Sequence, residues 1–236
     1  MKNGQGQPIA ILGGMGPDAS ARLYQQIINL ARSEYHAQAN HDYPEVIIHS
    51  IPVPDFISDT RKKSVAENML IERVKQLSKL PISCFGIACN TVHILLPELQ
   101  RITNIPFIDL PDEVARLVKL NNHHRVGLLA TPITITTGLY QNALSEEGIE
   151  VVTPTDTNIK RLGNVVKKIV SGDIVSSREE ALAVAESIKK QNITALILGC
   201  TELPLVFPKH YYLPVFDSLT VLAKVLLKRY YMKEEK

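Results

Sequence analysis

The chain has 236 residues, of which 45% are apolar. It contains 26 Lys and Arg residues and 24 Asp and Glu residues, which gives a formal net charge of +2. This apolar content is sufficient for one or two compact domains with buried cores. The charges are mixed along the chain and form neither the basic stripe of a nucleic-acid-binding protein nor a patch for a membrane surface. We therefore expect a small polar molecule as the partner, with no nucleic acid and no membrane.

The apolar runs are much shorter than a bilayer span, and Met1–Gly6 lacks a cationic leader, so a cytoplasmic protein is predicted. Three cysteines without a C-x-x-C spacing or a companion cluster of histidines fit neither a disulfide framework nor a structural zinc site. We expect reduced thiols and no bound metal.

Short β-branched runs alternate with longer helical patterns along the chain, which indicates β-α-β units around parallel sheets. The predicted strands of the first half are Ile9–Gly13, Val46–Ser50, Cys84–Ala88 and Phe107–Ile108. A helix is predicted between the second and third of these strands, because apolar residues recur there at spacings of four and three. Its apolar face consists of Ala66, Leu70, Val74, Leu77 and Leu80.

The second half of the chain repeats this alternation of strands and helices. Its predicted strands are Val126–Ala130, Val151–Thr153, Ala195–Gly199 and Val215–Phe216. Ser177 and Glu180 have the spacing of a capping box at a helix start, and Gly148 and Gly172 are predicted to end helices.

The two halves align with each other as an internal repeat. The offsets lie between 117 residues (Ile9 to Val126) and 108 residues (Ile105 to Leu213). The matched segments are Ile9–Leu12 with Val126–Leu129, Tyr24 with Tyr140, Phe85–Cys89 with Leu196–Cys200, Pro97 with Pro208, and Ile105–Asp109 with Leu213–Asp217. The prediction is an α/β fold of two pseudosymmetric three-layer α/β domains with parallel sheets and an active-site cleft between them. The expected domains are residues 1–118 plus 213–236 and residues 119–212.

Cys89 and Cys200 occupy equivalent positions at the carboxyl ends of their strands, where open parallel sheets bind ligands. Each cysteine is followed by a polar turn and a helix start, whose N–H groups are expected to lower the thiol pKa. Cys84 lies at the opposite end of the same strand as Cys89 and is assigned to the core. Two opposed thiols suit racemisation, in which one group removes the α-proton and another protonates the opposite face.

The residues beside the two cysteines each have a functional and a local interpretation. His93 is expected either to tune the Cys89 thiol or act on substrate, or to make only local hydrogen bonds. Glu202 caps its turn or binds the substrate ammonium group. The expected donors to an α-carboxylate, with helix capping as the alternative role, are Asn90, Thr91 and Thr201.

A glycine-rich loop, Gly13–Pro17, follows the first strand, and its spacing fits a dinucleotide fingerprint. The next strand runs into His49 and Ser50, where that fingerprint requires an acidic residue for the ribose. We therefore interpret the loop as a close-approach site for a small anion, and we expect no cofactor.

Three motifs resemble the aspartate/glutamate racemase family, most closely its aspartate racemase branch: I-L-G-G-M-G-P at Ile11–Pro17, C-N-T-x-H at Cys89–His93 and G-C-T-E at Gly199–Glu202. The resemblance implies a pyridoxal-phosphate-independent two-base mechanism and a homodimer. It makes Cys89 and Cys200 the catalytic thiols. It also implies that five further residues surround the substrate: Met15, Asn90, Thr91, Thr201 and Glu202.

The resemblance leaves the substrate side chain open. Where aspartate-specific members carry Arg and Lys, this chain has Phe56, which we assign to the substrate site, and Val170. Either Arg61, Lys167 or Lys168 binds a side-chain carboxylate, or the substrate is a neutral amino acid.

Aspartate or glutamate is the first expectation, and a broad-specificity racemase of neutral amino acids is the alternative. Decarboxylation or cis-trans isomerisation of small diacids on the same fold is a further option. Other classes are a nucleotide-dependent oxidoreductase using the glycine loop and a non-catalytic two-lobed binding protein.

Overall fold

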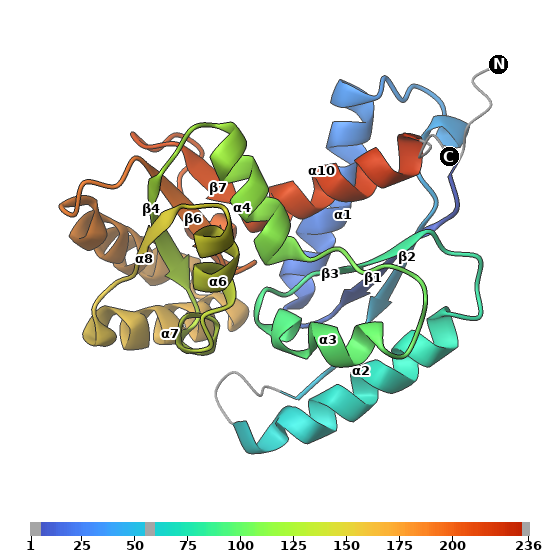
Figure 1. The fold of residues 1–236 in the computed structure, drawn as a ribbon, viewed down its shortest axis with the longest axis horizontal. Coiled ribbons are helices and arrows are strands. Elements are labelled where there is room, and N and C mark those ends of the chain that lie inside the picture. Colours follow the sequence, from blue (N-terminus) through green and yellow to red (C-terminus); the bar gives the residue numbers. More distant parts are fainter. Residues whose placement is uncertain (1–5, 55–59, 233–236) are drawn as a thin grey trace. The chain divides into compact units, whose positions relative to one another are not determined.

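The structure, a computed structural model, describes residues 6–54 and 60–232 (Figure 1). Two compact units are formed, one from Met1–Ala88, Leu95–Asp109 and Leu219–Lys236 and the other from Cys89–Ile94 and Leu110–Ser218. Each unit contains a parallel β-sheet with helices, so the predicted fold class of two parallel-sheet α/β units is confirmed.

The first unit is built on a sheet with the strand order β2-β1-β3. These strands are β1 (Ile9–Gly13), β2 (Val46–Ser50) and β3 (Cys84–Ile87). The helices of this unit are α1 (Pro17–Glu34), α2 (Lys63–Leu77), α3 (Leu96–Gln100) and α10 (Ser218–Tyr231), of which Ser218 belongs to the second unit. Figure 1 shows α2 and α3 on one side of the sheet and α1 and α10 on the other. Because helices cover both faces, every residue of the central strand β1 is buried.

The second unit is built on a sheet with the strand order β5-β4-β6-β7. Its strands are β4 (Arg125–Ala130), β5 (Glu150–Val152), β6 (Ala195–Gly199) and β7 (Val215–Asp217). Its helices are α4 (Leu110–Leu120), α5 (Pro132–Thr136), α6 (Leu139–Glu146), α7 (Asp156–Val170), α8 (Ile174–Lys189) and α9 (Leu203–Val206). A Cβ atom on Gly127 would meet α8, whereas one on Gly199 would meet α6, so these two helices cover opposite faces of the sheet.

The internal repeat is reproduced in the pairing of the strands. Ile9 pairs with Cys84 in the first sheet, and their counterparts Val126 and Ala195 pair in the second. The fourth element differs between the units. Strand β7 pairs along β6, whereas the predicted strand Phe107–Ile108 makes one isolated bridge, between Phe107 and Phe85.

The compact units divide the chain at other residues than the predicted domain ranges. Helix α4 packs against α6, and β7 completes the sheet of the second unit, so both lie outside the first unit. The domain ranges predicted from the repeat stay a proposal about folding units.

Two glycines end helices as predicted, and one predicted helix start is wrong. Gly148 and Gly172 follow α6 and α7 with φ values of 73° and 92°, the left-handed conformation that suits a helix stop. Helix α8 begins at Ile174 with Asp173 as its N-cap, so Ser177 lies inside the helix and forms no capping box with Glu180. The Ser177 hydroxyl donates to the Asp173 carbonyl one turn back instead.

Among the helices of the described residues, none is long and apolar enough to cross a membrane.

Candidate active site

Cys89 and Cys200 belong to the same compact unit. Cys200 directly follows β6, and Cys89 begins the short segment Cys89–Ile94 that leaves the first sheet and groups with the second unit. Both residues are buried, with 4% and 3% of their surface exposed. Burial is the largest cause of a raised pKa of Cys200, and the charge of Cys89 is the smallest of the causes that raise it. Both cysteines therefore belong to the second unit.

The turn that carries Cys200 contains a buried carboxylate, Glu202. The Cys200 thiol donates a hydrogen bond to Glu202 Oε2 over 3.0 Å, and the Thr201 hydroxyl donates to the same oxygen over 3.0 Å. Glu202 is 6% exposed and Thr201 is fully enclosed. A thiol and a carboxylate in direct contact away from water form a pair between which a proton can move.

The expected lowering of the thiol pKa is wrong for Cys200. Burial raises the pKa of this thiol well above its ordinary value, and the negative charge of Glu202 and its hydrogen bond raise the pKa further. One backbone N–H, that of Glu202, acts in the opposite direction. Helix α9 has only four residues, so its dipole is too short to outweigh desolvation and the adjacent carboxylate. At neutral pH this thiol is protonated.

His93 anchors the turn that carries Cys89. Its Nδ1 atom lies 3.0 Å from the Cys89 carbonyl oxygen and 3.2 Å from the Asn90 carbonyl oxygen. Both of these partners are acceptors, so Nδ1 must carry the hydrogen and donate it. The turn continues as a short 3₁₀ helix, Thr91–Leu95, rather than an α-helix. The imidazole thus makes the local hydrogen bonds, and a role of His93 toward substrate stays a prediction.

Asn90 is held by two buried hydroxyl groups from distant parts of the sequence. Its Oδ1 atom accepts from the Tyr140 hydroxyl over 2.5 Å, and its Nδ2 atom donates to Ser218 Oγ over 2.9 Å. Tyr140 lies in α6 and Ser218 begins α10, and both are fully buried. The amide beside Cys89 therefore has a defined position.

Three threonine hydroxyls form a buried triangle at the start of α5. Thr91 Oγ1 lies 3.0 Å from both Thr131 Oγ1 and Thr134 Oγ1, which are 2.9 Å from each other. Thr131 also caps α5, because its side chain accepts from the Thr134 N–H. Hydroxyls can reorient, so this cluster can present donors to an anion.

Four residues around the cysteines lie outside the sequence motifs: Thr131, Thr134, Tyr140 and Ser218. Thr131 directly follows the carboxyl end of β4, which pairs with β6. Open parallel sheets bind ligands at this end of their strands, so the reason for selecting the two cysteines also applies to Thr131. Tyr140 was present in the repeat alignment, but only as a marker of its helix.

The remaining predicted site residues are Met15 and Phe56. Met15 is half-buried between β1 and α1 in the first unit, and Phe56 lies outside the described residues.

The glycine loop is used for internal packing. Gly14 has a φ of 86°, and a Cβ atom there would lie 2.4 Å from the Ile51 backbone nitrogen. Its N–H donates to Ser20 Oγ over 2.9 Å and is not directed at an external anion. The close approach that this glycine permits is therefore made by the chain itself.

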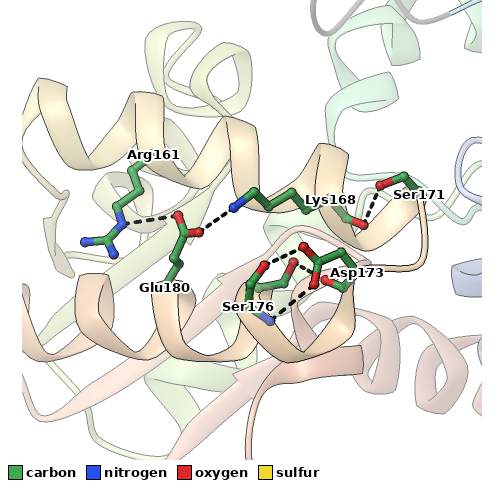
Figure 2. A network of polar contacts seen from close by, with 7 residues as sticks. Arg161, Lys168, Ser171, Asp173, Ser176 and Glu180 are labelled. Carbon is green, nitrogen blue, oxygen red and sulfur yellow. Dashed lines mark hydrogen bonds and ion pairs between the residues drawn. The ribbon is translucent and has the colours of Figure 1, made fainter.

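Lys168, one of the cations considered for a substrate carboxylate, is paired with another residue. Its Nζ atom lies 2.6 Å from Glu180 Oε1, and Arg161 Nε lies 3.4 Å from the other oxygen of that carboxylate (Figure 2). The hydrogen bond from Lys168 is the largest cause that lowers the pKa of Glu180. This network joins α7 to α8 on a partly exposed surface. Val170, at the end of α7, is 55% exposed.

Within the described residues, no group of three or more His, Cys, Asp and Glu side chains has the arrangement of a metal site.

Comparison with known proteins assigns the fold to one group of enzymes. The sequence model of the Asp/Glu/hydantoin racemase family matches residues 12–226. The broad specificity amino-acid racemase RacX of Bacillus subtilis is 24% identical over 223 residues, which cover 94% of this chain and 97% of that protein.

Two solved structures are similar over almost the whole chain. The aspartate racemase of Picrophilus torridus has a TM-score of 0.83 and 27% identity, covering 94% of each chain. An aspartate racemase homologue from Pyrococcus horikoshii has a TM-score of 0.77 and 28% identity, covering 94% of this chain and 98% of that one.

Proposed function

The chain belongs to the Asp/Glu/hydantoin racemase family, and from this premise we propose that it interconverts the L and D forms of an amino acid by proton transfer between Cys89, Cys200 and the substrate. The observation that carries the proposal is the hydrogen bond from the buried Cys200 thiol to Glu202. It gives one of the two thiols a proton acceptor at contact distance. No pyridoxal phosphate or other cofactor takes part in the proposed reaction.

In one direction the Cys200 thiol first gives its proton to Glu202. The resulting thiolate removes the α-proton of the substrate, and the S–H bond forms as the C–H bond breaks. Burial and the nearby carboxylate raise the pKa of Cys200, so its thiolate is a stronger base than an exposed one. A strong base is useful here because the α-proton of an amino acid is only weakly acidic.

Cys89 completes the inversion. Its thiol gives a proton to the opposite face of the α-carbon, which leaves a Cys89 thiolate, and the electron pair of the carbanion forms the new C–H bond. Exchange with solvent after product release returns the proton held by Glu202 and restores the Cys89 thiol. In the reverse direction Cys89 is the base and Cys200 is the acid.

The buried hydroxyls and the amide around the thiols are suited to an α-carboxylate. Thr91, Thr131 and Thr134 lie within 3.0 Å of one another, and Asn90 lies beside Cys89. Their hydrogen bonds to a carboxylate would replace the mutual hydroxyl contacts. Thr201 already donates to Glu202, so we assign it to the orientation of that carboxylate.

For the substrate side chain, aspartate or glutamate is the first candidate, supported by the likeness to aspartate racemases. One observation favours the alternative of a broad-specificity racemase for neutral amino acids. Lys168 is paired with Glu180, so use of this lysine for a substrate carboxylate would require breaking that ion pair. The similarity to RacX supports the same alternative.

The function is tested by incubating the purified protein, without added cofactor, in deuterated water with each of the twenty amino acids. Proton NMR measures α-deuteration, and circular dichroism measures inversion. We expect both with at least one chiral amino acid, an absorption spectrum without a pyridoxal band, and a dimer by light scattering.

Cys89→Ala and Cys200→Ala are expected to remove inversion, because each deletes one of the two proton-transfer groups. Cys84→Ala, which changes the third buried cysteine, is the matched control and is expected to remain active. Full inversion by both of the first two variants would disprove the two-cysteine mechanism.

A further inference from the structure

Tyr140 contacts the residues that adjoin both cysteines in the sequence. Its hydroxyl donates to Asn90 Oδ1 over 2.5 Å, next to Cys89 in the sequence. Its ring faces Gly199, next to Cys200, where a Cβ atom would lie 3.0 Å from Tyr140 Cε2. Tyr140 is completely buried. One rigid side chain therefore spans the two turns.

The bond from Tyr140 belongs to a longer buried chain. Asn90 receives the tyrosine hydroxyl on one side and donates to Ser218 on the other. Breaking one link would leave a buried acceptor or donor without its partner, which is costly away from water. The position of the Asn90 amide is thus coupled to the position of Tyr140.

The counterpart of Tyr140 in the repeat does not make this contact. Tyr24 occupies the equivalent position in the first half, and it is 44% exposed. The counterpart of Gly199 is Ala88, which carries the methyl group that would crowd Tyr140 in the second half. The absence of a Cβ atom at Gly199 and the burial of Tyr140 therefore occur together, in one copy only.

We propose that Tyr140 is a positioning residue that holds the Cys89 turn at the distance from the Cys200 turn that inversion requires. This inference rests on the proposed two-cysteine function. Inversion needs both thiols within reach of one α-carbon, on opposite faces, in the same complex. A displacement of one reacting group by about 1 Å is sufficient to cost about 100-fold in rate.

The test uses the ratio of exchange to inversion in deuterated water with Tyr140→Phe. This variant keeps the ring against Gly199 and removes the bond to Asn90, so the Cys89 turn moves while Cys200 stays in place. For the enantiomer that Cys200 deprotonates, the protium taken by Cys200 then exchanges with the deuteron that Glu202 holds, and Cys200 returns this deuteron to the original face. We expect its ratio of α-deuteration to inversion to rise at least about 10-fold, with kcat for inversion falling about 10- to 100-fold and KM changing less.

The opposite enantiomer provides an internal comparison. Its proton is removed by the displaced Cys89, so its exchange and inversion are expected to fall together. A purely structural role of Tyr140 would lower exchange and inversion equally for both enantiomers, and that result would overturn the proposal.

Tyr24→Phe is the matched control, because it removes the same hydroxyl from the equivalent exposed position. It is expected to keep the wild-type rate and the wild-type ratio. Ser218→Ala, which releases the other end of the Asn90 chain without altering Tyr140, is expected to shift the ratio in the same direction. Circular dichroism and thermal unfolding show whether Tyr140→Phe folds, and Ser218→Ala provides the test if it does not. An unchanged ratio of α-deuteration to inversion in a folded Ser218→Ala protein would then contradict the proposal.

The cysteine variants separate this inference from the function on which it rests. If Cys89→Ala and Cys200→Ala still invert the substrate, the proposed function fails. If both are inactive and Tyr140→Phe has the wild-type rate and ratio, only the role of Tyr140 fails.

Discussion

The two units share a strand order and a pairing register but differ in the groups that they bury. Among the described residues, the buried polar or charged side chains of the first unit consist of Ser20 alone. Those of the second unit are Asn90, Thr91, His93, Thr131, Thr134, Ser177, Thr201, Glu202 and Ser218. Repetition of the fold therefore reproduces the framework, whereas the polar groups are concentrated in one copy and in the segment that joins it.

The two cysteine turns differ in the same way. Cys200 is in contact with an acidic side chain, whereas the turn after Cys89 presents an amide, a hydroxyl and an imidazole whose bonds fix the backbone. Two thiols at equivalent positions of a repeat thus have different electrostatic surroundings.

Replacement of the acidic group, Glu202→Gln, is expected to lower kcat for inversion by about 100- to 1,000-fold, because Cys200 loses its proton acceptor. The negative charge that raises the pKa of Cys200 is also removed, so the pKa of this thiol is expected to fall toward its ordinary value. Inversion followed by circular dichroism between pH 6 and 10 measures both effects. Glu180→Gln, a carboxylate on the α7–α8 surface, is the control. Retention of more than a tenth of the activity in Glu202→Gln would rule out the proton-acceptor role.

Substitutions of Gly199 and Ala88, which precede the two cysteines, test the packing of the Tyr140 ring on Gly199. Gly199→Ala adds a methyl group that would lie only 2.9 Å from Leu128 Cδ1 and 3.0 Å from Tyr140 Cε2, so the backbone beside Cys200 or these side chains must shift. We expect kcat/KM to fall about 10-fold. The reciprocal change, Ala88→Gly, adds no atoms and is expected to cost less. Equal losses in the two variants would show that the packing of Tyr140 on Gly199 is unimportant.

Stability at alkaline pH provides a third test. Burial raises the pKa of Cys200 and of Cys84, so the folded protein keeps protons that the unfolded chain releases above about pH 8.5. The contribution of each thiol to stability is complete below that pH and is lost as pH rises toward the folded pKa. Each thiol adds about 1.4 kcal/mol per pH unit to this loss.

Urea unfolding between pH 7.5 and 9.5 measures the slope. Cys200→Ser and Cys84→Ser are each expected to reduce it, since serine does not ionise in this range. A slope in Cys200→Ser equal to that of the wild type would mean that the Cys200 pKa is not raised by folding.

The smallest effect is expected from Lys168→Gln, which breaks the ion pair with Glu180 shown in Figure 2. The pair is partly exposed, so we expect the thermal midpoint to fall by less than about 2 °C. KM for aspartate is expected to stay unchanged, because Glu180 binds this lysine. A selective rise in KM for acidic amino acids would instead assign Lys168 to the substrate carboxylate.

Most of the strands were predictable because their signal is local. β-Branched runs bounded by turns indicated Ile9–Gly13, Val46–Ser50 and Ala195–Gly199 with the bounds that the structure has. Gly148 and Gly172 marked helix ends because a left-handed residue suits glycine at any such position. Ser177 and Glu180 have the spacing of a capping box, but the helix begins four residues earlier, with Asp173 as its N-cap.

The two parallel α/β units and the equivalent positions of Cys89 and Cys200 follow from the order of residues, because periodicity and repetition are visible along the chain. The polar groups that meet these cysteines depend on how the chain packs. The bonds of Asn90 join residues 50 and 128 positions apart, and the threonine triangle joins residues up to 43 positions apart. The raised pKa of Cys200 depends first on burial, which arises only after the sheet and its helices have packed.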